Sequence, residues 1–274
     1  MNKIKTYVKK LWNIVFNPSM AYLPGNLAFF LMLSIFPILT LIGVIASELG
    51  VNIGSLINVI NTTLPKDVAN VLVAFIDGKG FDSNIGIFMI IGFYLASNGA
   101  DAIILASNNL YGFPNSDYIK RRIKAIFLIV LIIFALMFLL VFLGFGNHLL
   151  SFSLSYIKDK SVVNLIKNIF SVLKWPFSIF IIFFNVKLIY TIAPDWKIMS
   201  KHTTLGAAFT TICWIVIIQI YSYWVTHFTH YDLFYGSMSN IIILMLIVYI
   251  ISYILVIGIA INVKAYEYKP EISE

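Results

Sequence analysis

The stretch GFYLASNGADAIILASNNLYGF, residues 92–113, is long and apolar enough to cross a bilayer, yet it carries an acid, amides and hydroxyls. At the 100° per residue of a helix, seven of its side chains, six of them polar, fall within an arc of about 120°. This set, called the stripe below, consists of Tyr94, Ser97, Asn98, Asp101, Leu105, Asn108 and Asn109. The rest of the circumference is mainly Ile, Leu, Ala and Phe. The stretch therefore predicts a membrane-spanning helix with one polar face.

The composition around this stretch excludes an ordinary soluble domain. Of the 274 residues, 60% are apolar and only 11% are charged, whereas soluble proteins are roughly 25% charged. The apolar runs are continuous rather than alternating, which favours helices over a barrel. The net charge of +7 is typical of basic residues gathered near anionic headgroups, so no nucleic-acid partner is expected.

We predict an all-α membrane protein with a single domain over residues 1–274. Six runs reach the roughly 20 residues that a bilayer core requires. They cover residues 26–47, 85–108, 123–146, 169–193, 205–226 and 237–262. Pro37 and Pro176 fall inside the first and fourth runs, where they are expected to bend the helices.

Two further amphipathic elements are predicted outside the spans. Residues 4–16 alternate apolar and lysine faces, a pattern typical of a helix that lies flat in the interface. Residues 48–84 contain apolar side chains at helical spacing after LPKD, which predicts short helices over the outer face. The segment at 147–168 is predicted to be an outer loop.

The basic residues predict the orientation. Twelve Lys and Arg fall in the N-terminus, the 109–124 loop, the 194–204 loop and the tail, against five in the other loops. Since basic loops stay cytoplasmic, both termini are expected in the cytoplasm. Asp101 then lies in the cytoplasmic half of its span.

A carboxylate facing lipid costs roughly 2.5–3.5 kcal/mol, so the stripe must face other helices or water. Its polar groups are either hydrogen-bonding glue between helices, a substrate or ion pathway, or a contact for lipid headgroups. Lys187 is expected at the depth of Asp101, where it either pairs with that acid or extends toward the interface. Lys174 is expected to extend toward the outer headgroups.

Further polar residues offer candidate walls for such a pathway. Gln219, Ser222 and Tyr223 are neighbours in the fifth run, as are Tyr249, Ser252 and Tyr253 in the sixth. Gly206, Ala207, Ala208 and Gly236 allow close helix approach. His227, His230 and Asp232 fit an interfacial position better than a zinc site, because further ligands are not evident. No cofactor or metal is expected.

The blocks of the chain resemble, in order, those of the YihY/BrkB family of bacterial inner-membrane proteins. They are GNLAFFLMLSIFPILTLIG (25–43), ASNGADAIILASNNLYG (96–112), KRRIKA (120–125), IYTIAPDWK (189–197), LGAAFTTICWIV (205–216), YDLFYGSMSNIIILM (231–245) and VIGIAIN (256–262). The resemblance implies a six-helix fold in the bacterial cytoplasmic membrane. It also implies roles in serum resistance or in export of lipid-linked envelope precursors, while an old assignment of ribonuclease activity in the family is regarded as mistaken.

The first hypothesis for function is a transporter or flippase-like exporter of an amphipathic or lipid-linked envelope compound. Its pathway residues are Tyr94, Asn98, Asp101, Asn108, Lys187 and Gln219, and its headgroup-binding residues are Lys120, Arg121 and Arg122. The expected partners are membrane lipids and an anionic or lipid-linked substrate. The alternatives are an ion- or proton-coupled small-solute transporter and a non-transporting scaffold for envelope machinery. An enzyme is not expected, since no loop could house a catalytic domain.

Overall fold

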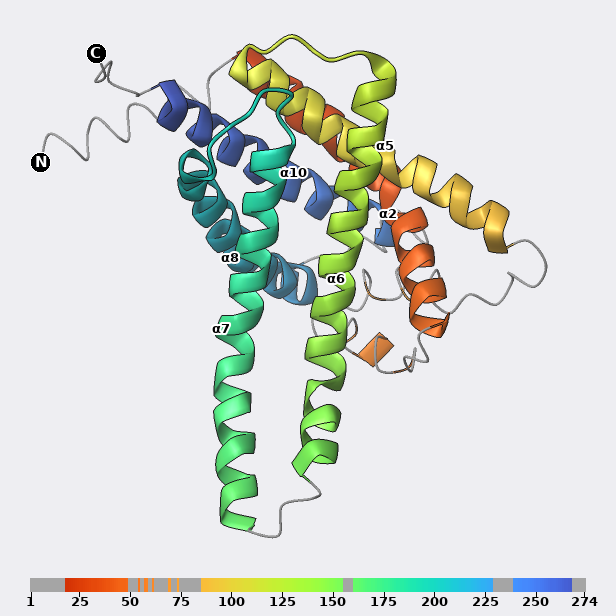
Figure 1. Cartoon of the computed structure of the whole chain (residues 1–274), viewed down its shortest axis with the longest axis vertical. Helices are drawn as coiled ribbons and strands as arrows, with labels where there is room; N and C mark the ends of the chain where they lie inside the picture. The colour runs from red at the N-terminus through yellow and green to blue at the C-terminus, as the bar shows by residue number, and fades with distance from the viewer. Residues whose placement is uncertain are drawn as a thin grey trace, which may run out of the picture.

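The computed structural model describes residues 18–48, 54, 57–58, 61, 69, 73, 85–154, 160–228 and 239–267. Six long helices are present in these ranges (Figure 1): α2 (Leu23–Glu48), α5 (Ile85–Tyr111), α6 (Tyr118–Leu154), α7 (Lys160–Ile192), α8 (Thr204–Phe228) and α10 (Ser239–Glu267). Two short 3-10 helices, η1 (Pro18–Ala21) and η2 (Ser200–His202), precede α2 and α8. The all-α prediction is confirmed for the described part of the chain.

Five of these helices are long and apolar enough to cross a membrane. The qualifying segments are Ile90–Tyr111, Tyr118–Leu139, Val162–Ile192, Thr204–Trp224 and Ile241–Tyr266. In α2, Leu23–Ile35 is the apolar segment among the residues whose side chains the structure describes. The sixth span therefore stays a prediction, as do the single domain and the bends at Pro37 and Pro176, which both lie inside continuous helices.

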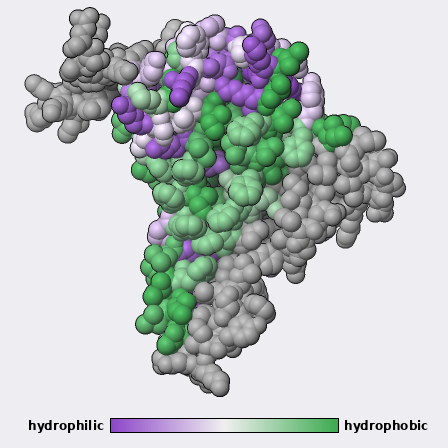
Figure 2. All heavy atoms as spheres, viewed as in Figure 1, coloured by the Kyte–Doolittle hydropathy of each residue, from purple (hydrophilic) through white to green (hydrophobic). Residues whose placement is uncertain are grey.

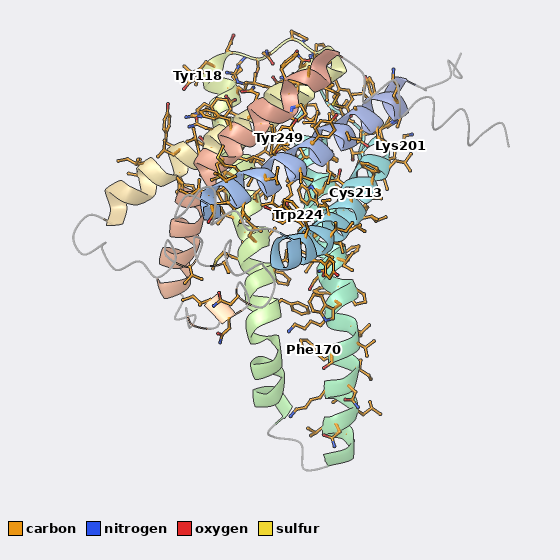
Figure 3. All side chains as sticks on the ribbon, turned by 180° about the vertical axis from the view of Figure 1, so that it is seen from behind. Tyr118, Phe170, Lys201, Cys213, Trp224 and Tyr249 are labelled. Atoms are coloured by element: carbon orange, nitrogen blue, oxygen red, sulfur yellow. The ribbon has the colours of Figure 1, made fainter. Side chains whose placement is uncertain are left out.

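The predicted outer loop at 147–168 is wrong for most of its length. Helix α6 continues to Leu154 and α7 already begins at Lys160, because apolar residues keep helical spacing on both sides of the connection. The two helices run side by side in opposite directions and extend well beyond the other described helices (Figure 1). Phe170 of α7 lies against Phe142 of α6, with 5.6 Å between ring centroids (Figure 3).

Helices α2, α5 and α10 form the packed centre of the described bundle. Their contact surfaces consist of small and apolar residues, among them Leu27, Ala100 and Ile259, which are at most 1% exposed. Where α2 meets α5, the Gly99 backbone N–H donates to Ser34 Oγ at 3.0 Å. Helix α6 packs on α5, and α8 packs between α7 and α10.

Helices α8 and α10 approach each other at glycine. A Cβ on Gly206 would collide with the backbone oxygen of Gly258, and a Cβ on Gly258 would collide with Thr210 and Tyr190. The predicted close approach is therefore confirmed at Gly206. Gly236 lies outside the described residues, as do residues 4–16, 229–238 and most of the 48–84 loop.

One end of the molecule collects the connections that the charge pattern assigned to a single side of the membrane. The start of α2 meets the end of α5 through Tyr22 and Asn109, whose side chains lie 3.2 Å apart. The end of α10 meets η2, where His202 Nδ1 lies 3.2 Å from the Ala265 carbonyl oxygen. Hydrophilic residues gather at this end, called the polar end below, whereas the described surface away from it is mainly apolar (Figure 2).

Candidate functional site

The stripe lies on α5, and its partner is the first turns of α6. Arg121 Nε donates to Asp101 Oδ1 at 2.6 Å, with the two side chains 16% and 17% exposed. Arg122 Nη1 donates to Asn98 Oδ1 at 2.8 Å. The predicted headgroup-binding arginines and the predicted pathway residues therefore form one cluster, which we call the charged cluster.

Aromatic rings complete the charged cluster on its exposed side. The Arg122 guanidinium lies 3.9 Å from the ring centroid of Tyr94, a cation–π distance. The Tyr94 and Tyr118 hydroxyls lie 3.5 Å apart. Tyr94 is 50% and Tyr118 57% exposed, so this side of the cluster is open, whereas Asn98 and Asp101 are half-buried.

Asp101 does not pair with Lys187. Its carboxylate is bonded to Arg121, so the hypothesis of an Asp101–Lys187 ion pair is wrong. The reason is topological, because among the described helices α5 packs closely against α6, and α7 packs mainly against α6 and α8. Lys187 is half-buried on α7, where its backbone carbonyl accepts a hydrogen bond from Thr191.

The C-terminal part of the stripe is held by hydrogen bonds to the α7–α8 connection. Asn108 is fully buried. Its Nδ2 donates to Asp195 Oδ2 at 2.6 Å, and its Oδ1 accepts from the Asp195 backbone N–H at 2.9 Å. Lys124 Nζ binds Asp195 Oδ1 at 2.9 Å and the Pro194 carbonyl at 2.7 Å. Ser116 adds its backbone N–H to Asp195 at 2.9 Å. We call this group, Asn108, Ser116, Lys124 and Asp195, the clasp.

The end of α5 presents Asn108 to the clasp. The Phe113 N–H donates to the Asn108 carbonyl at 2.9 Å, and the Gly112 N–H donates to the Asn109 carbonyl at 3.2 Å. With φ of +70° at Gly112, this is a Schellman motif, which requires a left-handed residue and therefore favours glycine. The motif stops α5 one turn after Asn108 and turns the chain back toward α6.

The remaining predicted site residues lie apart from these groups. Gln219 is exposed on α8, a helix that packs between α7 and α10, so the structure does not bring it to the stripe. Lys120 points outward with a 79% exposed side chain, 4.0 Å from Asp117. Of the predicted headgroup residues, Lys120 is thus the one most open to the surroundings.

Comparison with known proteins confirms the family resemblance. The family described as Virulence factor BrkB matches residues 19–274. The chain belongs to the BrkB family. It is similar to the ribonuclease-like protein YfkH of Bacillus subtilis, with 26% identity over 89% of this chain and 90% of that protein. It is also similar to a UPF0761 membrane protein of Vibrio campbellii, with 27% identity over 85% and 74% of the two chains. A UPF0761 membrane protein of Haemophilus influenzae is 32% identical over 27% of this chain. No solved structure matches.

Two features of this BrkB-family site could have been found in the sequence. Asp101 lies eleven residues before Gly112 and Arg121 nine after it, whereas Asn98 lies fourteen before and Arg122 ten after. Residues placed in this way meet when two helices pack as an antiparallel hairpin. The role of Asp195 carried no comparable signal, since 87 residues separate it from Asn108.

The clasp of this BrkB-family chain predicts a pH dependence. Partial burial raises the pKa of Asp195, but hydrogen bonds from Ser116, Lys124 and Asn108 outweigh it and hold the pKa below its usual value. The stability that the ionised carboxylate contributes is therefore present above an ordinary aspartate pKa of about 4 and is lost as the pH falls through the lower folded value.

We accordingly expect the purified protein to lose thermal stability on acidification below about pH 4. The variant Asp195→Asn should have a lower melting temperature at neutral pH. Its melting temperature should also fall less steeply as the pH is lowered. The control is Asp117→Asn, which changes the same charge at a side chain that is 86% exposed. If the melting temperature of Asp195→Asn fell with pH as steeply as that of the wild type, other carboxylates would be responsible for the loss of stability in acid.

Proposed function

We propose that this BrkB-family protein moves an amphipathic or lipid-linked envelope compound across the bacterial cytoplasmic membrane, without enzymatic chemistry. The observation that carries the proposal is the Asp101–Arg121 ion pair at 2.6 Å. A guanidinium binds carboxylate and phosphate oxygens with the same planar donor geometry. An anionic headgroup can therefore replace Asp101 on Arg121, and Asp101 can displace the headgroup afterwards.

The surroundings of the pair suit an amphipathic ligand. Ile119 and Ile123, on the same helix as Arg121, are 71% and 65% exposed, and Phe127 one turn further is 54% exposed. An acyl or polyprenyl tail can lie on this apolar surface while its headgroup reaches the arginines. Tyr94 and Tyr118 belong to the residue type that is enriched at the membrane–water interface.

The clasp favours a second candidate, a scaffold without transport. Asn108 uses both of its amide atoms in hydrogen bonds while fully buried, which is how packing glue between membrane helices behaves. A small-solute transporter with Asp101 as the titrating group is the further alternative. Asn108 therefore supports a packing role for the stripe, whereas Asp101 supports a transport role. A substitution at Asp101 is the change that distinguishes the two roles.

The test is lipid transfer in reconstituted vesicles. Labelled phosphatidylglycerol is placed in both leaflets, and the fraction protected from an impermeant quencher is followed in time. We expect the wild-type protein to accelerate exchange and Asp101→Asn to slow it about tenfold, equivalent to about 1.4 kcal/mol in the barrier. The melting temperature should fall less than in Arg121→Ala, since the amide oxygen still accepts the Arg121 hydrogen bond although the counter-charge is lost.

The matched control is Asp117→Asn, which should exchange lipid at the wild-type rate. Equal rates for wild type and Asp101→Asn would assign the stripe to packing. A wild-type protein that exchanges no more lipid than empty vesicles would contradict the lipid hypothesis and favour the scaffold. Dissipation of a proton gradient without lipid exchange would favour the small-solute alternative.

A further inference from the structure

Helix α8 has an exposed apolar face. Leu205 is 64%, Ile212 61% and Val216 49% exposed. At 100° per residue these side chains fall within an arc of about 40°, and Ala207 and Thr210 on the other side of the helix are fully buried. Leu205 and Val216 are about 16 Å apart along the helix axis, half of the roughly 30 Å thickness of a bilayer core. The face therefore has the length of one leaflet.

Lys201 lies at the start of this face. The Thr203 N–H donates to the Ser200 carbonyl at 3.3 Å and the Ala207 N–H donates to the Thr203 carbonyl at 3.1 Å, so the helical path continues from η2 into α8. A residue four positions before Leu205 is then its neighbour on the same face. Lys201 is exposed and lies at the polar end (Figure 3). Lys201 and the apolar side chains are thus on one side of α8.

The α7–α8 connection lies between two spans. The apolar segments of α7 and α8 end and begin next to it, so residues 193–203 lie where the hydrocarbon core meets the headgroups. Trp196 in this connection is 60% exposed, and tryptophan is enriched at that level of a membrane. Lys197 is also exposed. Because four residues of chain reach about 14 Å at most, Lys197 and Lys201 can approach the same headgroup.

The positive charges of Lys197 and Lys201 suit an anionic partner. Asp195 is the only acid between residues 193 and 228, and its carboxylate binds Lys124 in the clasp. In the part of the chain that the structure describes, neither Lys197 nor Lys201 forms an ion pair. An anionic lipid would supply the missing negative charge, whereas a zwitterionic lipid would leave the net charge of this surface unchanged.

We propose that α8 binds one anionic phospholipid of the leaflet at the polar end. Lys201, together with Lys197, holds the phosphate as a point charge, and an acyl chain lies along the apolar face from Leu205 to Val216. This lipid site is separate from the proposed transport, because α8 packs mainly against α7 and α10, whereas the charged cluster lies on α5 and α6. The bound lipid anchors the α7–α8 connection, and with it the clasp, at the membrane surface.

The experiment measures lipid preference by native mass spectrometry of the full-length protein in detergent, with phosphatidylglycerol and phosphatidylcholine added together. We expect the wild type to retain phosphatidylglycerol preferentially. Since a lysine near an anionic surface contributes roughly a fivefold gain in binding, K201Q should lose about fivefold of this preference and K197Q/K201Q about 25-fold. K197R/K201R should keep it, which separates loss of charge from damage to the connection.

The matched control is K167Q, which removes a lysine from an exposed position near the other end of α7 and should keep the preference. An unchanged preference in K201Q, or an equal loss in K167Q, would overturn the proposal. Displacement of phosphatidylglycerol by excess glycerol phosphate would also overturn it, since that anion has no acyl chain to lie on α8. A dimer that binds no phosphatidylglycerol and dissociates on the substitution Ile212→Trp would assign the face to a second copy and contradict the proposal.

Discussion

Gly206→Ala is expected to lower the stability of the protein by about 3 kcal/mol, at the upper end for overpacking. The added Cβ would collide with the backbone oxygen of Gly258 and with Asn262 Oδ1. A backbone oxygen cannot move aside without moving α10. The collision also distorts the hydrogen bond from the Gly206 N–H to Asn262 Oδ1, now 2.8 Å. The measurement is the melting temperature of the detergent-purified protein, together with its level in the membrane.

The control for this prediction is Gly25→Ala in α2. A Cβ at Gly25 meets no atom within 4 Å, and alanine is a better helix former by about 1 kcal/mol. The Gly25 variant should therefore match or exceed the wild type in melting temperature. If Gly206→Ala melted at the same temperature as Gly25→Ala, helices α8 and α10 could not be as close as described.

Arg121→Ala is expected to destabilise the protein by about 2–3 kcal/mol, because it leaves Asp101 without its counter-charge. Removing one member of a fully buried pair costs about 3–5 kcal/mol, and the partial exposure of this pair reduces the cost. The double variant with Asp101→Ala should recover part of the loss, since both charges are then absent. Thermal melting of the three variants in the same detergent measures the effect.

Lys187→Ala tests the competing assignment of the partner. With Arg121 bonded to Asp101, loss of the Lys187 ammonium should change the melting temperature by much less than loss of Arg121. If Lys187→Ala lowered the melting temperature more than Arg121→Ala, and Asp101→Ala restored it, Asp101 would be paired with Lys187 of α7. Because the readout is stability, the outcome does not depend on whether the protein transports lipid.

Part of the charged cluster could be anticipated from local information. The amphipathic arc on residues 92–113 identified the stripe because helical periodicity depends only on neighbours along the chain. It did not identify what the stripe faces. The 147–168 segment was assigned to a loop because its polar and basic residues weaken the hydropathy signal, yet helical spacing continues through most of it.

By itself, the sequence determined that the chain is helical, membrane-embedded and of the BrkB family. A chain that is 60% apolar and 11% charged cannot cover a soluble core, and in lipid its backbone groups must be satisfied within helices. The tertiary structure alone decided which charges meet. Asp101 pairs with Arg121 and not with Lys187, and Asp195 is hydrogen-bonded to Asn108, 87 residues away in the sequence, because these pairings depend on which helices pack together. A helix determines the face on which a side chain lies, and only its neighbours determine the partner.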